Sequence, residues 1–353
     1  MSYKEQLNKL IEAVGTQGAS DLHLHVGHRP TVRVSGALVP LVSFPELTSK
    51  DTEGLVSELL TAENESLFLK QKDLDFSFMT DSGLRFRGNA FFQKGVIGVA
   101  LRLITAKIRN FNELNLPAIL EEITHRKQGF FLVVGPVGQG KSTTLAAMVN
   151  MINQERAEHI ITIEDPVEYL YPPGKSIVDQ REVRFDTTDF SSAMKSLFRE
   201  DVNVAMIGEM RTPETISTAV TAAETGHLIF STLHTNNAAQ TIDRIIDSFP
   251  GSQQSQIRVQ LAGSLIGIFS QRLLPRISGG QIPAYELLLN NSAVSNLIRE
   301  GRTHEINMVL ETGSEAGMID MNHSIATLVR NGDINAEDAY RYTLDPEGLQ
   351  RLL

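Results

Sequence analysis

The sequence has no cysteine among its 353 residues. This absence excludes disulfide bonds, cysteine-ligated zinc and a cysteine nucleophile, and it fits a reducing compartment. No stretch approaches the roughly 18 uninterrupted apolar residues of a membrane-spanning helix. Residues 1–14, MSYKEQLNKLIEAV, are charged and amphipathic and lack the apolar region of a signal peptide. We therefore expect a cytoplasmic chain that is neither secreted nor integral to a membrane.

Clusters of basic residues are also missing. The chain carries 32 Lys and Arg against 42 Asp and Glu, a formal net charge of −10. Residues 1–107 hold 12 of each sign, which leaves 20 basic against 30 acidic residues in 108–353. A protein that grips nucleic acid by its phosphates usually presents a basic face. We therefore expect no nucleic-acid partner.

Hydrophobic periodicity divides the chain into two domains. Within residues 1–107, helical spacing over 7–14 gives way to alternating strands, with two helical segments beginning near Thr48 and Thr61. This order predicts a small α+β domain with antiparallel strands and helices on one side. The strands are expected at 22–26, 31–34, 73–78, 84–92 and 95–104. Residues 108–117 lack periodicity and contain a proline, so we expect a linker there.

Residues 118–353 alternate strands with helices, the rhythm of a largely parallel sheet. The strands are expected at 130–134, 160–163, 204–207 and 228–232, and the helices after Lys141 and around 190–198 and 214–224. The apolar segment 261–269 is expected to pack in a core or an interface between subunits.

A glycine-rich loop follows the strand at 130–134. Residues 135–142, GPVGQGKS, fit the pattern of a glycine, four residues and then Gly-Lys-Ser, with a helix after them. Glycines let several backbone N–H groups approach phosphate oxygens, while the lysine neutralises them and the serine hydroxyl ligates Mg²⁺. The sequence therefore predicts binding of ATP with Mg²⁺. The expected binding residues are Gly135, Pro136, Val137, Gly138, Gln139, Gly140, Lys141, Ser142 and Thr143.

Two strand ends carry carboxylates. The apolar segment 202–207 ends in Gly208-Glu209, where most phosphate-loop ATPases have an aspartate that helps to hold Mg²⁺. The strand at 160–163 ends in Glu164-Asp165, and Pro166 then breaks the chain direction. Glu164 and Glu209 are both candidates to hold Mg²⁺, directly or through water, and to accept a proton from the attacking water. The sequence leaves open which of them is the catalytic base.

These motifs together resemble the secretion-superfamily ATPases. Residues 164–168, EDPVE, resemble that family's aspartate box, and Gly208-Glu209 its atypical Walker B. Residues 221–227, TAAETGH, and 231–235, STLHT, resemble the histidine box. Four boxes in the family's order are far more specific than any one of them.

Within that superfamily the similarity extends over nearly the whole chain to the type IV pilus retraction ATPases, the PilT family. Its N-terminal domain is matched by 19–24, ASDLHL, by 27–30, GHRP, and by 85–91, RFRGNAF. Residues 293–301, AVSNLIREG, resemble the AIRNLIRE segment linked to retraction. Two departures are visible: the loop reads GPVGQGKST instead of GPTGSGKST, and Val294 and Ser295 replace isoleucine and arginine.

The resemblance implies a RecA-like ATPase domain after a smaller PAS-like N-terminal domain, assembled as a homo-hexamer. Such a ring hydrolyses ATP to power pilus retraction, working at the inner membrane through a pilus platform protein. His227 and His234 flank an apolar strand, and beside the sheet edge they are candidates for phosphate sensing or the Mg²⁺ shell; His227 is included among the catalytic residues.

Other function classes remain open. One is an accessory retraction paralogue of the PilU type, which the departures at 294 and 295 favour; such a paralogue is also a possible partner. Another is an ATPase of pilus extension, type II secretion or conjugation, although extension and type II enzymes generally carry a four-cysteine zinc element. A RecA-like nucleic-acid translocase is disfavoured by the acidic ATPase half.

The resemblance further implies that an arginine from a neighbouring subunit's N-terminal domain acts at the ATP, and three arginines of residues 1–107 are candidates. An arginine aimed at the γ-phosphate accelerates phosphoryl transfer by about 10³–10⁵ in GTPases. Arg85 and Arg87 share one face of a strand, and Arg102 interrupts an apolar run. We expect Arg102 to be the first candidate. The alternative is ion pairing with Asp73, Asp75 or Asp81.

Overall fold

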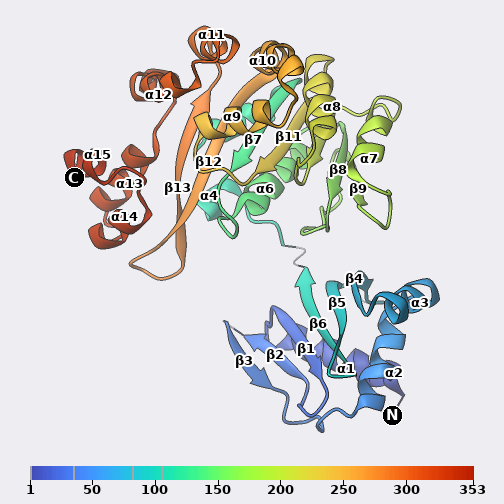
Figure 1. Ribbon diagram of the computed structural model, residues 1–353. Helices are drawn as coiled ribbons and strands as arrows, with labels where there is room; N and C mark the ends of the chain where they lie inside the picture. Colours follow the sequence, from blue (N-terminus) through green and yellow to red (C-terminus); the bar gives the residue numbers. More distant parts are fainter. Residues whose placement is uncertain (1, 35, 82, 105–106) are drawn as a thin grey trace. The chain divides into compact units, whose positions relative to one another are not determined.

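A computed structural model of the chain describes residues 2–34, 36–81, 83–104 and 107–353. The chain divides into two compact units, Met1–Ala106 and Lys107–Leu353 (Figure 1).

The first unit is a six-stranded antiparallel sheet with three helices. The strand order is β3-β2-β1-β6-β5-β4. The elements are α1 (Tyr3–Thr16), β1 (Asp21–His25), β2 (Thr31–Val34), β3 (Ala37–Pro40), α2 (Ser49–Leu59), α3 (Ala62–Gln71), β4 (Asp73–Met79), β5 (Arg85–Gln93) and β6 (Val96–Ile104).

Apolar residues at every second position of the central strands decide which face of this sheet the helices cover. Leu22 and Leu24 of β1 lie opposite Leu101 and Val99 of β6, and all four side chains are fully buried against α1 and α2. The residues next to them along the strands, such as Asp21 and Arg102, face the other side because side chains alternate along a strand. The predicted α+β packing with helices on one side is present.

The second unit contains a seven-stranded sheet of order β13-β12-β7-β11-β10-β8-β9. All neighbours are parallel except β12 and β13. The elements up to the last strand are α4 (Phe111–Leu114), α5 (Ile119–Thr124), β7 (Gly129–Val134), α6 (Lys141–Glu155), β8 (His159–Glu164), β9 (Ile177–Glu182), α7 (Phe190–Leu197), β10 (Val204–Ile207), α8 (Pro213–Glu224), β11 (Leu228–Leu233), α9 (Ala238–Asp247), α10 (Gly251–Ser264), β12 (Leu265–Pro275) and β13 (Gln281–Leu289).

Helices cover both faces of this sheet, because its central strands are buried on both sides. In β7, Phe130 and Leu132 pack with residues of α7 to α12, whereas Phe131 and Val133 pack with α4, α5 and α6. The result is three layers, and the carboxyl ends of the parallel strands share one edge.

The chain ends in short helices beside β12 and β13 (Figure 1). A separate small core joins the ends of these two strands to the last three helices. The segments are α11 (Ser292–Glu300), α12 (Ile306–Thr312), α13 (Met321–Arg330), α14 (Ala336–Tyr342) and α15 (Pro346–Leu352), with 3₁₀ turns at Thr303–Glu305 and Ser314–Ala316.

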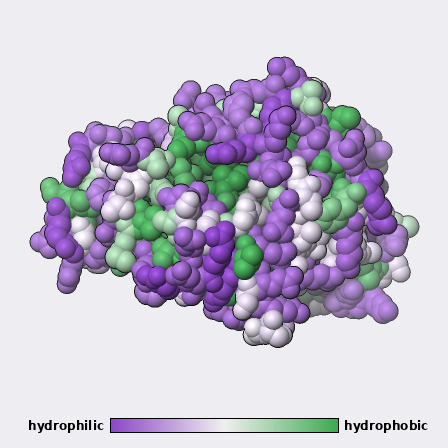
Figure 2. Space-filling view, turned by 90° about the horizontal axis from the view of Figure 1, so that it is seen from above, coloured by the Kyte–Doolittle hydropathy of each residue, from purple (hydrophilic) through white to green (hydrophobic). Residues whose placement is uncertain are grey.

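Several elements differ from the sequence predictions. The stretch 108–117 contains α4, and Phe111 and Leu116 are buried in the core of the second unit. The apolar segment 261–269, by contrast, packs in the core as expected: it is the end of α10 and the start of β12, and Leu261, Leu265 and Phe269 are buried. Strands β3, β9, β12 and β13 were not predicted from periodicity. Within the described ranges, none of the helices has the length and apolar character needed to cross a bilayer. Figure 2 shows mostly hydrophilic residues on the face it presents, with hydrophobic residues in separate patches.

Candidate functional site

The glycine-rich loop joins the carboxyl end of β7 to the amino end of α6. Gly135, Gly138 and Gly140 have φ values of +146°, +77° and +79°, a region that residues with a Cβ rarely adopt. Helix α6 then begins at Lys141. The first N–H groups of this helix have no partner within the helix and carry its positive dipole end, so they favour an anion.

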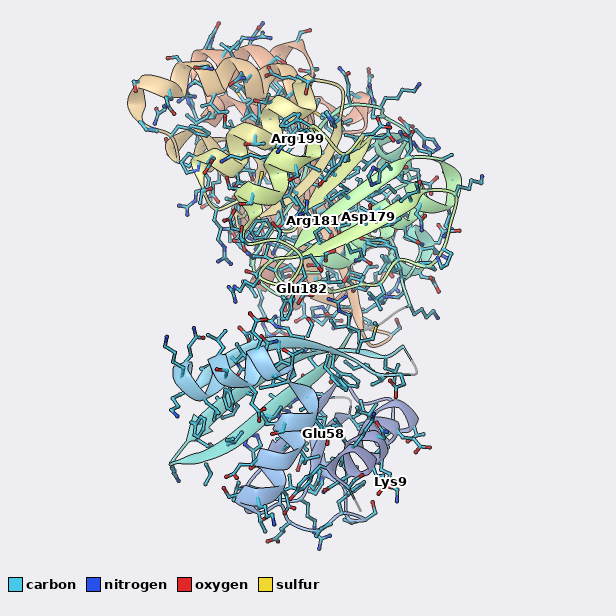
Figure 3. The ribbon with its side chains drawn as sticks, turned by 90° about the vertical axis from the view of Figure 1, so that its right-hand side faces the viewer. Lys9, Glu58, Asp179, Arg181, Glu182 and Arg199 are labelled. Carbon is cyan, nitrogen blue, oxygen red and sulfur yellow. The ribbon has the colours of Figure 1, made fainter. Side chains whose placement is uncertain are left out.

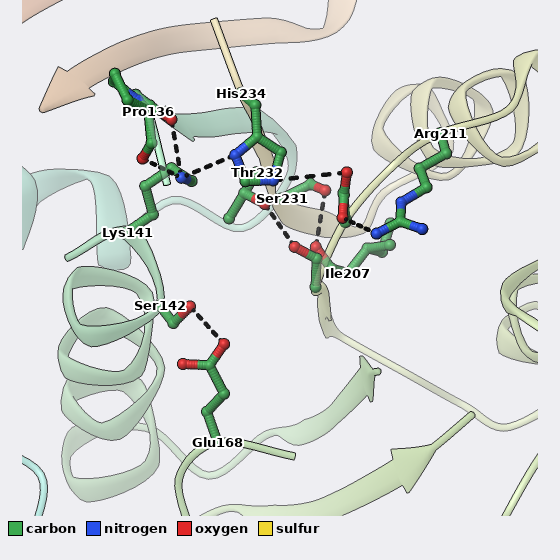
Figure 4. Close-up of polar contacts among 12 residues, drawn as sticks. Pro136, Lys141, Ser142, Glu168, Ile207, Arg211, Ser231, Thr232 and His234 are labelled. Carbon is green, nitrogen blue, oxygen red and sulfur yellow. Dashed lines mark hydrogen bonds and ion pairs between the residues drawn. The ribbon is translucent and has the colours of Figure 1, made fainter. Parts of the chain in front are cut away.

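Lys141 is folded back onto the loop. Its Nζ donates to the carbonyl oxygens of Gly135 and Pro136, both at 2.8 Å, and lies 3.2 Å from Nδ1 of His234 (Figure 4). Burial lowers the pKa of the Lys141 ammonium, and Glu209 and Glu168 partly oppose this shift. The ammonium group thus lies against the loop, where two carbonyl oxygens accept its hydrogen bonds and two carboxylates favour its charged form.

The first turn of α6 is tied to the segment after β8. The Ser142 hydroxyl donates to Oε1 of Glu168 at 3.0 Å (Figure 4), and Thr143 Oγ1 lies 2.7 Å from the Tyr169 hydroxyl. Glu168 and Tyr169 follow Pro166, whose peptide bond with Asp165 is cis. The hydroxyl predicted to ligate Mg²⁺ therefore already contacts a carboxylate.

Glu164 ends β8 with a side chain that is 6% exposed. Its Oε1 accepts hydrogen bonds from Thr162 Oγ1 at 2.7 Å and Gln180 Nε2 at 3.2 Å, and its Oε2 accepts one from the Glu168 N–H at 3.2 Å. Burial raises the pKa of the Glu164 carboxyl to about 7, against the lowering effect of these hydrogen bonds. This group can exchange a proton near neutral pH.

The edge strand β9 supports that segment. Asp179 and Arg181 alternate with Gln180 and Glu182 along the strand, and Figure 3 labels Asp179, Arg181 and Glu182 on it. Gln180 donates to the Tyr169 carbonyl oxygen at 2.7 Å, and Glu182 accepts from the Val167 N–H at 3.2 Å. The polar face of β9 thus holds the chain that carries Glu168.

Glu209 follows β10 in a different electrostatic setting. Arg211 Nη2 donates to its Oε2 at 2.8 Å, and His234 Nε2 lies 3.6 Å from its Oε1 (Figure 4). The hydrogen bond from Arg211 lowers the pKa of the Glu209 carboxyl despite partial burial. Glu209 therefore stays ionised near neutral pH, whereas Glu164 can be protonated there.

These groups line one cavity of about 440 Å³. It is bounded by residues 137–143 of the loop and helix, by Glu164 and Glu168, by Glu209 and Arg211, and by His234. All come from the carboxyl edge of the sheet, as the positions of the motifs after parallel strands require. Among the described residues no cluster of three or more His, Asp or Glu side chains forms a ready metal site. Any Mg²⁺ here would need phosphate and water oxygens to complete its shell.

The structure does not bring His227 to this cavity. His227 precedes β11, and its Nδ1 lies 3.0 Å from the carbonyl oxygen of Ala222 while its ring packs edge-on against Phe198. His234 follows the same strand and lines the cavity. The two histidines therefore lie at opposite ends of β11, which rises about 3.3 Å per residue. The sequence could have favoured His234 over His227, because ligands bind at the carboxyl ends of parallel strands and His234 follows β11 while His227 precedes it.

Arg85, Arg87 and Arg102 belong to the first unit. Arg102 Nε donates to Oδ1 of Asp21 at 2.9 Å, although its side chain is 69% exposed. Asp73 and Asp75, two of the expected ion-pair partners, accept hydrogen bonds from Asn89. Arg87 lies directly opposite Arg102 in the β5–β6 pairing, so two cations are neighbours on one face. Hydrogen bonds from Ser20 and Arg102 lower the pKa of the Asp21 carboxyl against the effect of burial.

The family model of the type II/IV secretion system proteins matches residues 2–332. The chain belongs to this family. The predicted resemblance to secretion ATPases is thereby confirmed, as is the fold class, a RecA-like ATPase domain with a smaller N-terminal α+β domain.

Individual family members are similar over nearly their full length. The "Type IV pilus retractation ATPase PilT" of Pseudomonas aeruginosa is 40% identical over 97% of this chain and 99% of its own. The "Type IV pilus ATPase PilU" of the same species is 36% identical over 99% of this chain and 91% of its own. A crystal structure of the pilus retraction motor PilT with bound ADP has a TM-score of 0.92 at 45% identity, covering 97% of this chain and 98% of that one.

Proposed function

We propose that this protein is an ATP-hydrolysing motor that powers type IV pilus retraction. The observation that carries the proposal is the single cavity that Lys141 of the loop shares with Glu164 and Glu209 from two strand ends. Phosphoryl transfer needs a cation close to the phosphate oxygens and a correctly positioned water. Lys141 supplies the cation, and the carboxylates at the ends of two strands can position the water. The similarity to PilT proteins over nearly the whole chain supports retraction as the work performed.

The side chains divide the chemistry between them. Lys141 exchanges its loop carbonyl partners for phosphate oxygens, and the N–H groups at the start of α6 bind the same anion. Oxygen donors are what Mg²⁺ prefers, and Ser142 with Glu168 already provides them at the helix start. Ser142 would hold Mg²⁺ directly, with Glu164 and Glu209 acting directly or through water. When bound, the ion neutralises charge on the phosphates.

The proposed working form is a homo-hexamer in which Arg85, Arg87 or Arg102 of one subunit completes the site of its neighbour. Exposure of most of the Arg102 side chain leaves its guanidinium accessible to an anion beyond Asp21. We place the ring in the cytoplasm against the inner membrane, where it acts on the pilus platform protein. ATP is the substrate, and nucleic acid is not a partner because the ATPase half is acidic.

The decisive experiment combines ATPase activity with a cellular phenotype. Purified protein should hydrolyse ATP in a Mg²⁺-dependent reaction that Lys141→Ala abolishes. Deletion of the gene should give cells with excess pili and no surface motility, because extension continues without retraction. Loss of pili would instead assign the protein to extension, and absence of hydrolysis would contradict the motor.

An accessory retraction ATPase of the PilU type is the second candidate. The 36% identity to PilU over 99% of the chain keeps it open beside the 40% identity to PilT, and Ser295 in place of the expected arginine favours it. Ser295 is buried, and its hydroxyl donates to the Ala262 carbonyl oxygen at 3.0 Å, so this position offers no charge to a partner. Restoration of retraction by this chain alone in a strain without other retraction ATPases would favour the primary motor. Restoration only beside a second paralogue would favour the accessory role.

A further inference from the structure

Strand β12 continues past the end of β7 and runs beside the phosphate loop. The last β7–β12 pair joins Val134 to Ser270, and the next residues on each strand are Gly135 and Gln271. A Cβ on Gly135 would lie 2.4 Å from the Gln271 carbonyl oxygen. The loop therefore begins in direct contact with the β12 backbone.

Gln271 joins the middle of the loop to the first turn of α6 with one buried amide. Its side-chain oxygen accepts a hydrogen bond from Thr144 Oγ1 at 2.6 Å, in the first turn of α6. Its Nε2 donates to the backbone carbonyl oxygen of Gln139 at 2.8 Å, in the middle of the loop. Gln271 is 3% exposed and Thr144 is 1% exposed, so water cannot replace these bonds easily.

The Gln139 side chain accepts a second hydrogen bond from β12. Its side-chain Oε1 accepts from the Leu273 N–H of β12 at 2.7 Å. A Cβ on Gly140 would lie 2.8 Å from Gln271 Nε2 and 3.3 Å from Leu273 Cδ1, so the loop and β12 touch without spare room. Each glutamine side chain thus bonds to the backbone across the contact: Gln271 to Gln139 of the loop, and Gln139 to Leu273 of β12.

We propose that Gln139 and Gln271 are positioning residues that hold the phosphate loop in its nucleotide-binding shape against β12. A loop rich in glycine loses much conformational freedom when it orders around phosphates. The hydrogen bonds of Gln139 and Gln271 order the loop before the nucleotide binds, which reduces this entropic cost. Their loss should therefore weaken nucleotide affinity. The inference rests on the proposed function of the site, since it concerns the same phosphates.

The test measures affinity for a fluorescent ADP analogue, together with KM and kcat for ATP. Gln139→Ser shortens the side chain so that it cannot reach Leu273, and affinity should fall about three- to tenfold for one lost hydrogen bond. Gln271→Met leaves the Thr144 hydroxyl and the Gln139 carbonyl unpaired, and affinity should fall about ten- to a hundredfold. The loss should appear in Kd and KM more than in kcat. Gln256→Ser, on the exposed side of α10, is the matched control and should bind as the wild type does.

Thr144 separates a positioning effect from general instability. Thr144→Ser keeps the hydroxyl that donates to Gln271 and should retain nucleotide affinity, whereas Thr144→Val removes this donor and should lower the affinity. The Thr144→Val, Gln271→Met pair should lose no more than Gln271→Met alone, because both remove the same bond. If Gln271→Met does not fold, Gln139→Ser and the two Thr144 variants decide the question.

The proposal is overturned if Gln139→Ser binds the analogue within twofold of the wild type, or if Thr144→Ser and Thr144→Val lose affinity equally. A wild-type protein that does not bind the analogue would contradict the proposed function itself. The two failures are therefore distinguishable.

Discussion

The Lys141 ammonium lies 3.2 Å from Nδ1 of His234, a residue 93 positions later in the chain. Lysine can only donate, so these partners assign Nδ1 as the acceptor and place the proton on Nε2, which faces Glu209. Burial and the Lys141 charge lower the pKa of the His234 imidazole, which keeps the ring neutral at physiological pH. His234 therefore links the cation that binds phosphate to the carboxylate that follows β10.

Replacing His234 should impair hydrolysis more than nucleotide binding. His234→Ala removes the ring that contacts Lys141 on one side and Glu209 on the other, and kcat should fall by at least about tenfold, towards the roughly 10²–10³ seen for a lost hydrogen-bond donor at a reacting centre. His227→Ala should leave nucleotide affinity unchanged, because the His227 ring contacts Ala222 and Phe198. Steady-state ATPase and nucleotide binding measure both. A larger kcat loss from His227→Ala than from His234→Ala would reverse this assignment.

Lys141 and the two carboxylates should give different defects. Lys141→Ala should abolish nucleotide binding, whereas Glu209→Gln should keep nucleotide bound and reduce kcat by about 10²–10³, because it affects placement of water or metal. Glu164→Gln in parallel identifies which carboxylate accepts the proton, by the deeper loss of kcat. Binding is measured by a fluorescent nucleotide and kcat by phosphate release. Near-normal turnover of Glu209→Gln would contradict its role.

Stability should fall as pH rises through the titration of Glu286. This carboxyl on β13 accepts the Ala238 N–H at 2.7 Å, and burial raises its pKa to about 7 from an ordinary 4.5. The folded state holds the proton longer than the unfolded state, so this contribution is complete below about pH 4.5 and is lost towards pH 7 and above. Glu286→Gln keeps the acceptor oxygen and removes the titration. It should be more stable than the wild type at pH 8 by about 1–3 kcal/mol.

Urea unfolding at pH 5 and pH 8 tests this. Glu347→Gln, at an exposed position on α15, is the control and should follow the wild type at both values. An equal pH dependence in the wild type and Glu286→Gln would show that Glu286 is not buried as a neutral acid.

The exposed face of α11 should separate transmission of force from hydrolysis. Ile298 is fully buried, so Ile298→Ala should cost about 2–5 kcal/mol of stability and cannot test transmission. Asn296 and Arg299 are exposed and hydrogen-bonded to each other at 3.0 Å. Asn296→Ala with Arg299→Ala should keep ATPase activity and the thermal midpoint while retraction in cells is lost. Loss of ATPase activity along with retraction would contradict a separate transmission role.

Mixed rings test whether Arg102 acts on a neighbouring subunit. Lys141→Ala and Arg102→Ala proteins should each be inactive, and activity should return on mixing, because some interfaces then join an intact Lys141 to an intact Arg102. Asp21→Asn removes the carboxylate that Arg102 contacts and is the control for a structural role. If Asp21→Asn is as inactive as Arg102→Ala, the ion pair explains the defect. If co-assembled rings stay inactive, Arg87 should be tested before the shared site is abandoned.

The local chemistry of the site followed from the sequence. A glycine loop between a strand and a helix, with Lys141 and Ser142 at the helix start, has one structural meaning because its parts are neighbours in the chain. The strand ends at Glu164 and Glu209 were also predictable, since parallel strands of alternating α/β units place their carboxyl ends at one edge. The buried strands β7, β8, β10 and β11 of the second unit and most strands of the first were predictable because their apolar runs are continuous or alternate, whereas the longer β12 and β13 were not.

Contacts between distant segments were decided only by the tertiary structure. Gln271 and Gln139 meet because β12 pairs with β7, and this order of strands in the sheet leaves no periodic signal in the sequence. The edge strand β9 escaped prediction because its residues from Asp179 to Glu182 are polar or charged, with Gln180 and Glu182 holding the segment after Glu164. Periodicity reports which face of an element is buried, whereas pairing between strands is set by packing across the whole sheet.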